Sequence, residues 1–144
     1  MAQAPTGVQL KIRPWELGRE LAVYLHTLSL GVFVVGASTG NTIFLGRMPD
    51  KPEIALAIQM DPAPNAGGLS RPHVTIFQRH TDIVLGATLA CRVWEAFDRK
   101  APHLSGHKVF CQCDGEPPAS PNSNANNLPV FAIPISISGV PRTA

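Results

Sequence analysis

Residues 72–100 constrain the fold of this chain most, because a short strand pattern there turns almost directly into a long helical one. Val74 and Ile76 alternate with residues of a second face, which is the two-residue period of a β-strand. From Thr81 onward, apolar residues recur at spacings of three and four, and Pro102 stops any continuation of that pattern. So short a connection makes a rigid corner, relative to which the remaining elements can be placed.

The helical part of this corner has a predicted start and a predicted buried stripe. Thr81 is a good N-cap residue, and Asp82 in the first turn suits the positive end of the helix dipole. The stripe expected to face the core consists of Ile83, Ala87, Ala90, Trp94 and Phe97.

A second helix is expected to begin at Pro14, a residue well suited to a first helical position. Its apolar side consists of Leu17, Leu21, Leu25 and Leu28, and its polar side of Glu16, Arg19, Glu20 and His26. Strands are predicted at 42–45, 54–60, 73–79, 108–114 and 130–138. In the strand at 54–60, Ile54, Leu56, Ile58 and Met60 form one face. Ala55 and Ala57 lie on the other face, and their small size suggests that a helix packs closely there.

This element order predicts an α+β fold, in which one twisted, mostly antiparallel β-sheet is packed by two α-helices. The whole chain, 1–144, is expected to form a single domain with a flexible arm at 1–12. Residues 115–127, rich in Pro, Asn and Ser, are expected to form an exposed loop. Pro134 cannot donate to a sheet ladder, so its strand should lie at an edge or carry a bulge.

Composition limits the classes of function. The chain has 144 residues, of which 44% are hydrophobic and 15% charged, with a net charge of +2. A surface so poor in charge suits a protein that buries much of itself against neighbours, and it does not suit a dedicated nucleic-acid binder. We find no signal-peptide pattern, no apolar run long enough to span a bilayer and no disulfide framework, so we expect a protein of a reducing cytoplasm that does not engage membranes.

The cysteines and histidines allow two chemical interpretations. Cys111 and Cys113 share one face of a strand and could bind zinc with the histidines at 80, 103 and 107, although the spacing is not that of a zinc knuckle. Cys91 with His80 could form a nucleophile pair. Burial as small apolar residues explains all three thiols more simply, and no catalytic sequence motif is present. We therefore expect no metal, no cofactor and no enzymatic activity.

Eight residues are candidates for contact with other subunits or partners. Arg79 and Arg92, at the end of the central strand and in the following helix, suit either a subunit contact or an ordinary surface ion pair. The long connections 61–71 and 115–127 suit ordering against a partner, and the strand at 130–138 suits edge pairing. The candidates are Arg79, Arg92, Gly67, Gly68, Asn122, Asn124, Phe131 and Pro134.

Two motifs carry a resemblance to a known family. The segment Met48-Pro49-Asp50-Lys51-Pro52 leads into the alternating strand at 54–60, and a later strand ends in Gln78-Arg79 directly before an alanine-containing helix. In this element order, over 13–138, the chain resembles the tail terminator or minor capsid proteins of long-tailed bacteriophages.

The resemblance implies a virion structural protein that is assembled in the cytoplasm of the host bacterium. Such proteins form a homohexameric ring that caps the tail tube, ends its polymerisation and joins the tail to the head. The implied partners are further copies of the chain, the tail tube protein and the head–tail connector or neck proteins, while genomic DNA passes through the lumen without specific binding. The alternatives are another neck component (a head-completion or head–tail joining protein), a tail tube subunit, a small His/Cys enzyme or a nucleic-acid-binding module.

Overall fold

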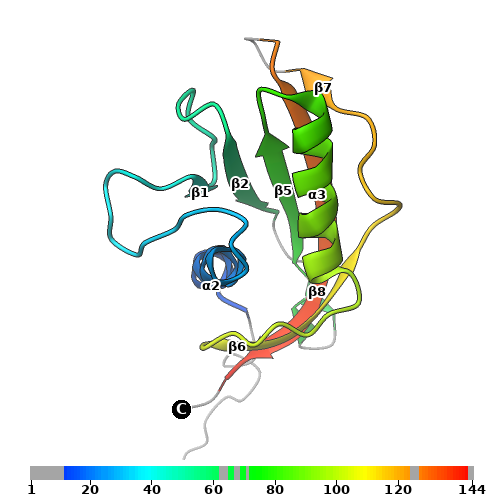
Figure 1. Ribbon diagram of the computed structural model, residues 1–144. Coiled ribbons are helices and arrows are strands. Elements are labelled where there is room, and N and C mark those ends of the chain that lie inside the picture. The colour runs from blue at the N-terminus through cyan, green and yellow to red at the C-terminus, as the bar shows by residue number, and fades with distance from the viewer. Residues whose placement is uncertain (1–11, 62–64, 67–68, 71, 124–126, 143–144) are drawn as a thin grey trace, which may run out of the picture.

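The computed structural model describes residues 12–61, 65–66, 69–70, 72–123 and 127–142. Two helices, α2 (Pro14–Thr27) and α3 (Ile83–Phe97), pack on one sheet (Figure 1). The described strands are β1 (Ile43–Leu45), β2 (Ala55–Met60), β3 (Asn65–Ala66), β4 (Leu69–Ser70), β5 (His73–Arg79), β6 (His107–Cys113), β7 (Asn122–Ser123) and β8 (Pro129–Pro141). β1 runs parallel to β2, and every other strand pair within the described ranges is antiparallel. The predicted α+β class is confirmed.

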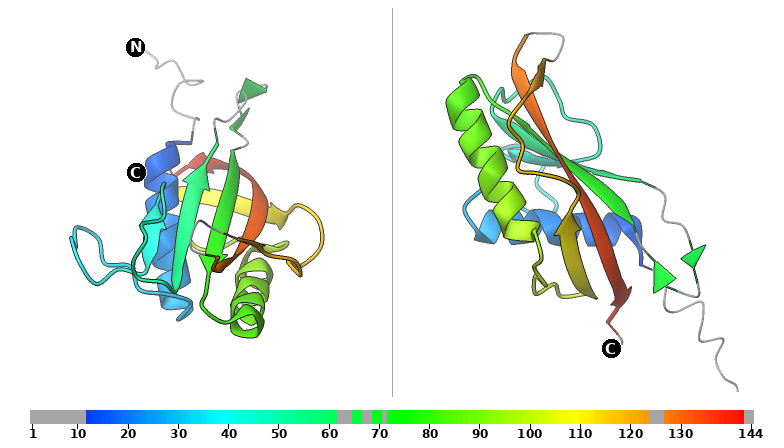
Figure 2. Two further views of the ribbon diagram at one scale, coloured as in Figure 1. Left: turned by 90° about the horizontal axis from the view of Figure 1, so that it is seen from above. Right: turned by 90° about the vertical axis from the view of Figure 1, so that its right-hand side faces the viewer.

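Both helices cover the same face of the sheet (Figure 2). The register aligns Ile58 of β2 with Ile76 of β5 and Ile76 with Ile133 of β8, so their side chains project to one side. A Cβ atom added to Gly18 of α2 would lie 3.5 Å from Met60 Sδ, and one added to Gly86 of α3 would lie 3.2 Å from the Phe131 ring. The core therefore forms between this face and the two helices.

The prediction of a helix on the small-residue face of β2 is wrong. Ala55 and Ala57 are buried at 2% and 0% exposure, yet α2 packs against the Met60 side of the same strand. The register places Arg79 on the face of Ala55, and its guanidinium reaches the carbonyls of the 49–53 segment. That segment therefore lies on the small-residue face.

Helix α2 begins at Pro14, as predicted, and its leucine stripe at 17, 21 and 25 is fully buried. The stripe ends there, because Leu28 is the C-cap and is 44% exposed. Glu20 does not belong to the exposed polar side, since it is only 9% exposed.

Helix α3 starts one residue later than predicted. Asp82, and not Thr81, is the N-cap, and its carboxylate accepts the amide N–H of Leu85 at 2.9 Å. The buried stripe consists of Gly86, Ala90, Val93 and Phe97. Ile83 is 54% exposed, because the close approach of Gly86 to the sheet sets a different face inward.

The prediction that the strand carrying Pro134 lies at an edge or carries a bulge is wrong, because β8 has neighbours on both sides and its register with β5 runs through Pro134 without interruption. β8 lies inside the sheet, with β5 along one side and β6 and β7 along the other. β6 pairs with β8 only from Ile135 onward, and β7 only at Pro129 and Val130. The carbonyl of Pro134 accepts the N–H of Asp114 on this partly open side, so the missing N–H of the proline interrupts no bond to β5.

The two predicted irregular segments are described only in part. The arm at 1–12 lies outside the described residues except for Ile12, which is 7% exposed and belongs to the core. In the predicted loop at 115–127, residues 115–120 are mostly exposed. Asn122 and Ser123 nevertheless form β7, which pairs with Val130 and Pro129 of β8.

We predict that Gly139→Ala destabilises the fold by about 1–3 kcal/mol, which is a typical cost of overpacking. An added Cβ would lie 2.3 Å from the carbonyl oxygen of Lys108, which belongs to the β6 backbone and has no room to retreat. Urea unfolding measures the effect. The neighbouring Ser138→Ala, at an exposed position, serves as control and should change stability by no more than about 0.5 kcal/mol.

Candidate interaction surfaces

Arg79 is an internal clamp. It is 3% exposed, its Nε donates to the carbonyl of Glu53 at 3.0 Å, and its Nη2 donates to the carbonyls of Pro49 and Pro52 at 2.7 and 2.6 Å. The alternative of a surface ion pair is therefore wrong. The guanidinium donates its hydrogen bonds to backbone carbonyls, and Arg79 offers almost no surface to a neighbouring subunit. It instead fixes the proline-rich 49–53 segment.

Phe131 and Pro134 lie on opposite faces of β8. Phe131 is fully buried and contacts the α3 side of the sheet, so it is a core residue. Pro134 is exposed on the face opposite to the two described helices, which we call the helix-free face. Only Pro134 of this pair is open to a partner.

The candidates in the two loop regions are described only in part. Asn122 is exposed and lies in β7. Gly67, Gly68 and Asn124 lie outside the described residues, so their predicted role as contacts stays a prediction.

Arg92 lies on the outer side of α3, where a groove of about 630 Å³ runs between the helix and the segment that follows β6. We call this the α3 groove. Its floor is largely apolar, and its lining includes Ile83, Val84, Ala87, Cys91, Glu95 and Ala119. Ile83, Val84 and Leu85 are 54%, 69% and 55% exposed in a single helical turn. Three large apolar side chains left in solvent together are typical of an interaction site.

A second apolar surface lies beside α2. Val34 and Val35, in the loop after the helix, are 53% and 57% exposed, and Val23 of α2 is 39% exposed. Val35 and Val23 line a hollow of about 400 Å³ together with Arg19 and His103. We call Val23, Val34 and Val35 the valine patch.

The loop that carries the valine patch is held by polar contacts. The Val34 N–H donates to the side-chain oxygen of Asn41 at 2.9 Å, and the Val32 N–H donates to Thr42 Oγ1 at 2.8 Å. The Ala37 N–H donates to the Val34 carbonyl at 3.1 Å. These bonds fix the backbone of the loop while its valines remain in solvent.

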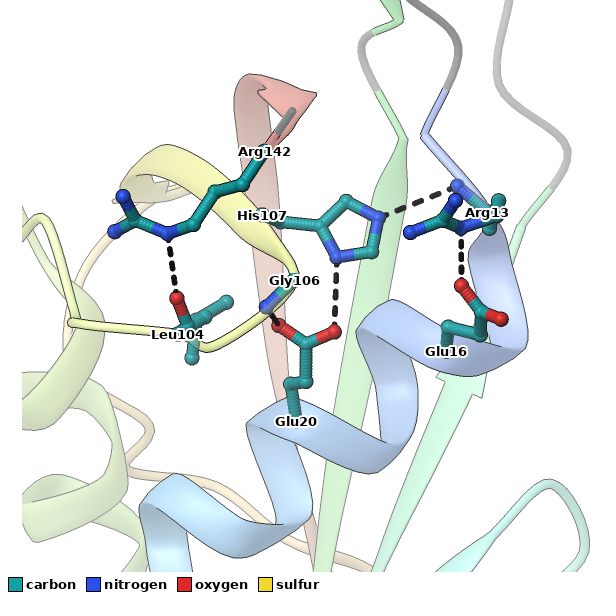
Figure 3. Close-up of polar contacts among 7 residues, drawn as sticks. All are labelled: Arg13, Glu16, Glu20, Leu104, Gly106, His107 and Arg142. Atoms are coloured by element: carbon teal, nitrogen blue, oxygen red, sulfur yellow. Dashed lines mark hydrogen bonds and ion pairs between the residues drawn. The ribbon is translucent and has the colours of Figure 1, made fainter. Parts of the chain in front are cut away.

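A buried polar tie that sequence reasoning missed joins α2 to β6 (Figure 3). His107 is fully buried, its Nδ1 lies 3.0 Å from Glu20 Oε2, and Glu20 Oε1 accepts the Gly106 N–H at 2.8 Å. His107 Nε2 accepts the backbone N–H of Arg13 at 3.4 Å, so the tautomer that satisfies both contacts carries its proton on Nδ1. The only sequence signal was the position of Glu20 beside Leu21 in the leucine stripe.

Cys91 and His80, considered above as a possible nucleophile pair, bond to other partners. Cys91 Sγ contacts the carbonyl of Pro118 at 3.7 Å, whereas His80 Nδ1 accepts the N–H of Asp82 at 2.8 Å. Burial raises the pKa of Cys111 to about 12, helped by the neighbouring Cys113 thiol. Burial, followed by Asp98 and Asp114, also raises the pKa of Cys113 to about 12. Both thiols are therefore protonated near neutrality and are poor nucleophiles.

Within the described ranges, no three His, Cys, Asp or Glu side chains gather as a metal-binding group. None of the helices in that part of the chain is long and apolar enough to cross a bilayer.

We predict that the two candidate arginines differ sharply in their effect on stability. Arg79→Ala should lower the free energy of unfolding by about 2–3 kcal/mol, because it leaves three carbonyls without their donor. Arg92→Ala, at an exposed position, is the matched control and should change it by no more than about 0.5 kcal/mol. Urea unfolding of both variants tests this, and equal losses would contradict the clamp.

We also predict that the buried thiols make stability fall at alkaline pH. The folded pKa of Cys111 is raised above its ordinary value of 9.0, so the folded state keeps a proton that the unfolded chain releases. This contribution is complete below pH 9 and is lost as the pH rises towards 12. Because tyrosine and lysine titrate in the same range, the measurement is the difference between wild type and Cys111→Val in unfolding free energy across this interval. A parallel pH dependence in the two proteins would contradict the assignment.

Comparison with known proteins gives a likeness of fold. No protein-family model matches the sequence, and no curated protein matches it. A solved chain from a structure described as "Virion of native gene transfer agent (GTA) particle" aligns with a TM-score of 0.53 and 10% sequence identity. The alignment covers 87% of this chain and 97% of that chain. At this identity the likeness establishes a shared fold over nearly the whole of both chains.

Proposed function

We propose that this chain is a virion structural protein, and in particular a tail terminator. It would form a ring on the tail tube, end the polymerisation of the tube and offer a surface for head or neck proteins. The observation that carries the proposal is the fold shared with a chain of a gene transfer agent virion, which covers 97% of that chain. The sequence resemblance to tail terminators points to the same class of particle.

The arrangement of the surface supports an assembly role. Two apolar surfaces, the α3 groove and the valine patch, are exposed on a chain of 144 residues. Exposed apolar clusters of this kind are unusual in a protein that works alone and are expected where subunits pack together. A heterologous interface that closes on itself produces a ring.

The histidines and cysteines that were candidates for catalysis or metal binding make structural contacts or are buried. The imidazole of His107 is held by Glu20 and by the backbone of Arg13, and His80 accepts the N–H of Asp82. Cys111 and Cys113 keep their protons because burial raises their pKa to about 12. A mechanism based on shape needs none of these groups to react.

The proposed mechanism is differential docking. One face of the ring would bind the end of the tail tube, and the opposite face would lack the surface that a further tube subunit requires. The same opposite face would then be available to a neck protein. Localisation in the virion and the absence of a cofactor follow from this role.

We predict that the purified chain assembles into discrete rings and that these rings bind one end of isolated tail tubes. Negative-stain electron microscopy of the protein, alone and mixed with tubes, tests this. Stacking into long tubes would favour a tube subunit, and rings that bind heads or neck complexes but not tubes would favour another neck component. A chain that stays monomeric both alone and with tubes would overturn the proposal.

A further inference from the structure

The α3 groove and the valine patch lie on opposite flanks of the molecule. Figures 1 and 2 place the loop after α2 on one side and α3 with the segment after β6 on the other. The two surfaces therefore cannot meet within one chain. They can meet between two copies that are related by a rotation. One copy then keeps its free valine patch and the other its free α3 groove, and each of these can bind a further neighbour.

Both surfaces are apolar, and the backbone of the valine patch is held in place. The valine patch includes a loop whose backbone is fixed by the contacts of Val32 and Val34, so its exposed valines are presented without a large loss of freedom on binding. The α3 groove has a volume of about 630 Å³, and Val84 in its lining is 69% exposed. The exposed valines of the loop can pack against this largely apolar lining.

The charges at the two surfaces are complementary. Arg19 borders the hollow beside the valine patch and forms no ion pair with another described residue. Glu95 lines the α3 groove and is likewise without an ion pair in the described part of the chain, although Arg92 lies three residues before it on the same helix. An unpaired arginine at one surface and an unpaired glutamate at the other suit a contact between copies.

We propose that the occupant of the α3 groove is the valine patch of a second copy of this chain, with Arg19 of one copy beside Glu95 of the next. This inference rests on the proposed function, since it supplies the lateral contact from which a ring would be built. Because the two surfaces differ, the contact is heterologous and has a direction around the ring.

Two single substitutions test the two surfaces separately. Val35→Asp places a charge in the valine patch, and Val84→Asp places one in the α3 groove. Both positions are more than half exposed, so the folded monomer should tolerate either change. Each variant alone should associate about tenfold more weakly or worse, as measured by sedimentation velocity. Phe110→Asp, at a position 47% exposed on the helix-free face, is the matched control and should assemble like wild type.

Mixing the two variants tests that these surfaces bind each other. The Val84→Asp protein keeps an intact valine patch, and the Val35→Asp protein keeps an intact α3 groove. The mixture should therefore form a one-to-one dimer that cannot extend, at concentrations where each variant alone associates at least about tenfold more weakly. A mixture that remains monomeric would overturn the pairing, because it would mean that each surface binds something else.

The charge pair has its own test. Arg19→Glu and Glu95→Arg should each weaken assembly of the wild-type ring, and the double variant should recover it. Recovery is expected only if the two side chains meet, whereas additive loss in the double variant would overturn their placement.

Failure of this inference is distinguishable from failure of the proposed function. Rings that form unchanged with Val35→Asp and Val84→Asp would overturn the inference and leave the tail terminator proposal standing. A wild-type chain that forms no ring, alone or on tail tubes, would overturn both.

Discussion

The structure depends on one constraint, which is that a single face of the sheet is buried and both helices share it. Cross-strand pairs such as Ile58 with Ile76 and Ile76 with Ile133 point to the same side, and every strand with a long pairing register follows that parity. A one-residue slip in the pairing of a strand would move its apolar side chains from the buried face to the opposite face. The apolar alternation therefore fixes the register across the sheet. The helices α2 and α3 then pack on the buried face, and among the described residues it is the 49–53 segment that lies on the opposite one.

Two sets of buried polar contacts fix segments that lie outside the centre of the apolar core. Arg79 fixes the 49–53 segment through three carbonyls, and the pair of Glu20 and His107 fixes α2 to the start of β6. A buried charge or imidazole is costly unless its hydrogen bonds are made, so each contact also specifies the position of the segment that supplies its partners. The ends of the sheet are thus ordered by polar contacts, and its centre is ordered by apolar ones.

The sequence predicted the elements well and the polar contacts poorly. The strand–helix corner, the leucine stripe and the antiparallel α+β class follow from periodicity, which is a local property of the chain. The position of Pro134 in a strand with neighbours on both sides depends on where β6 ends and β7 begins, and no local pattern carries that information. Arg79 was expected at the surface because arginine usually lies there, and only the distant carbonyls of the 49–53 segment explain its burial. Ile83 lines the α3 groove, although helical periodicity predicts it in the buried stripe. The close approach of Gly86 to the sheet turns a different face of the helix inward.

The helix-free face of the sheet has a different character from the two apolar flanks, and this difference bears on how a ring would be oriented. Of the candidates, Pro134 lies on this face, together with hydroxyl-bearing Ser136 and Ser138. Its described charged side chains are of both signs. Lys108 is exposed on it and His73 lies 3.8 Å from Asp114, while the 49–53 segment adds Asp50, Lys51 and Glu53. Arg79, which has the same parity, has its guanidinium buried against carbonyls and adds little positive potential. Phosphate groups bind where lysine and arginine gather, and on this face the exposed lysines at 51 and 108 are accompanied by acidic side chains. In the proposed ring the flanks would join neighbouring subunits, so both faces of the sheet would point away from those contacts.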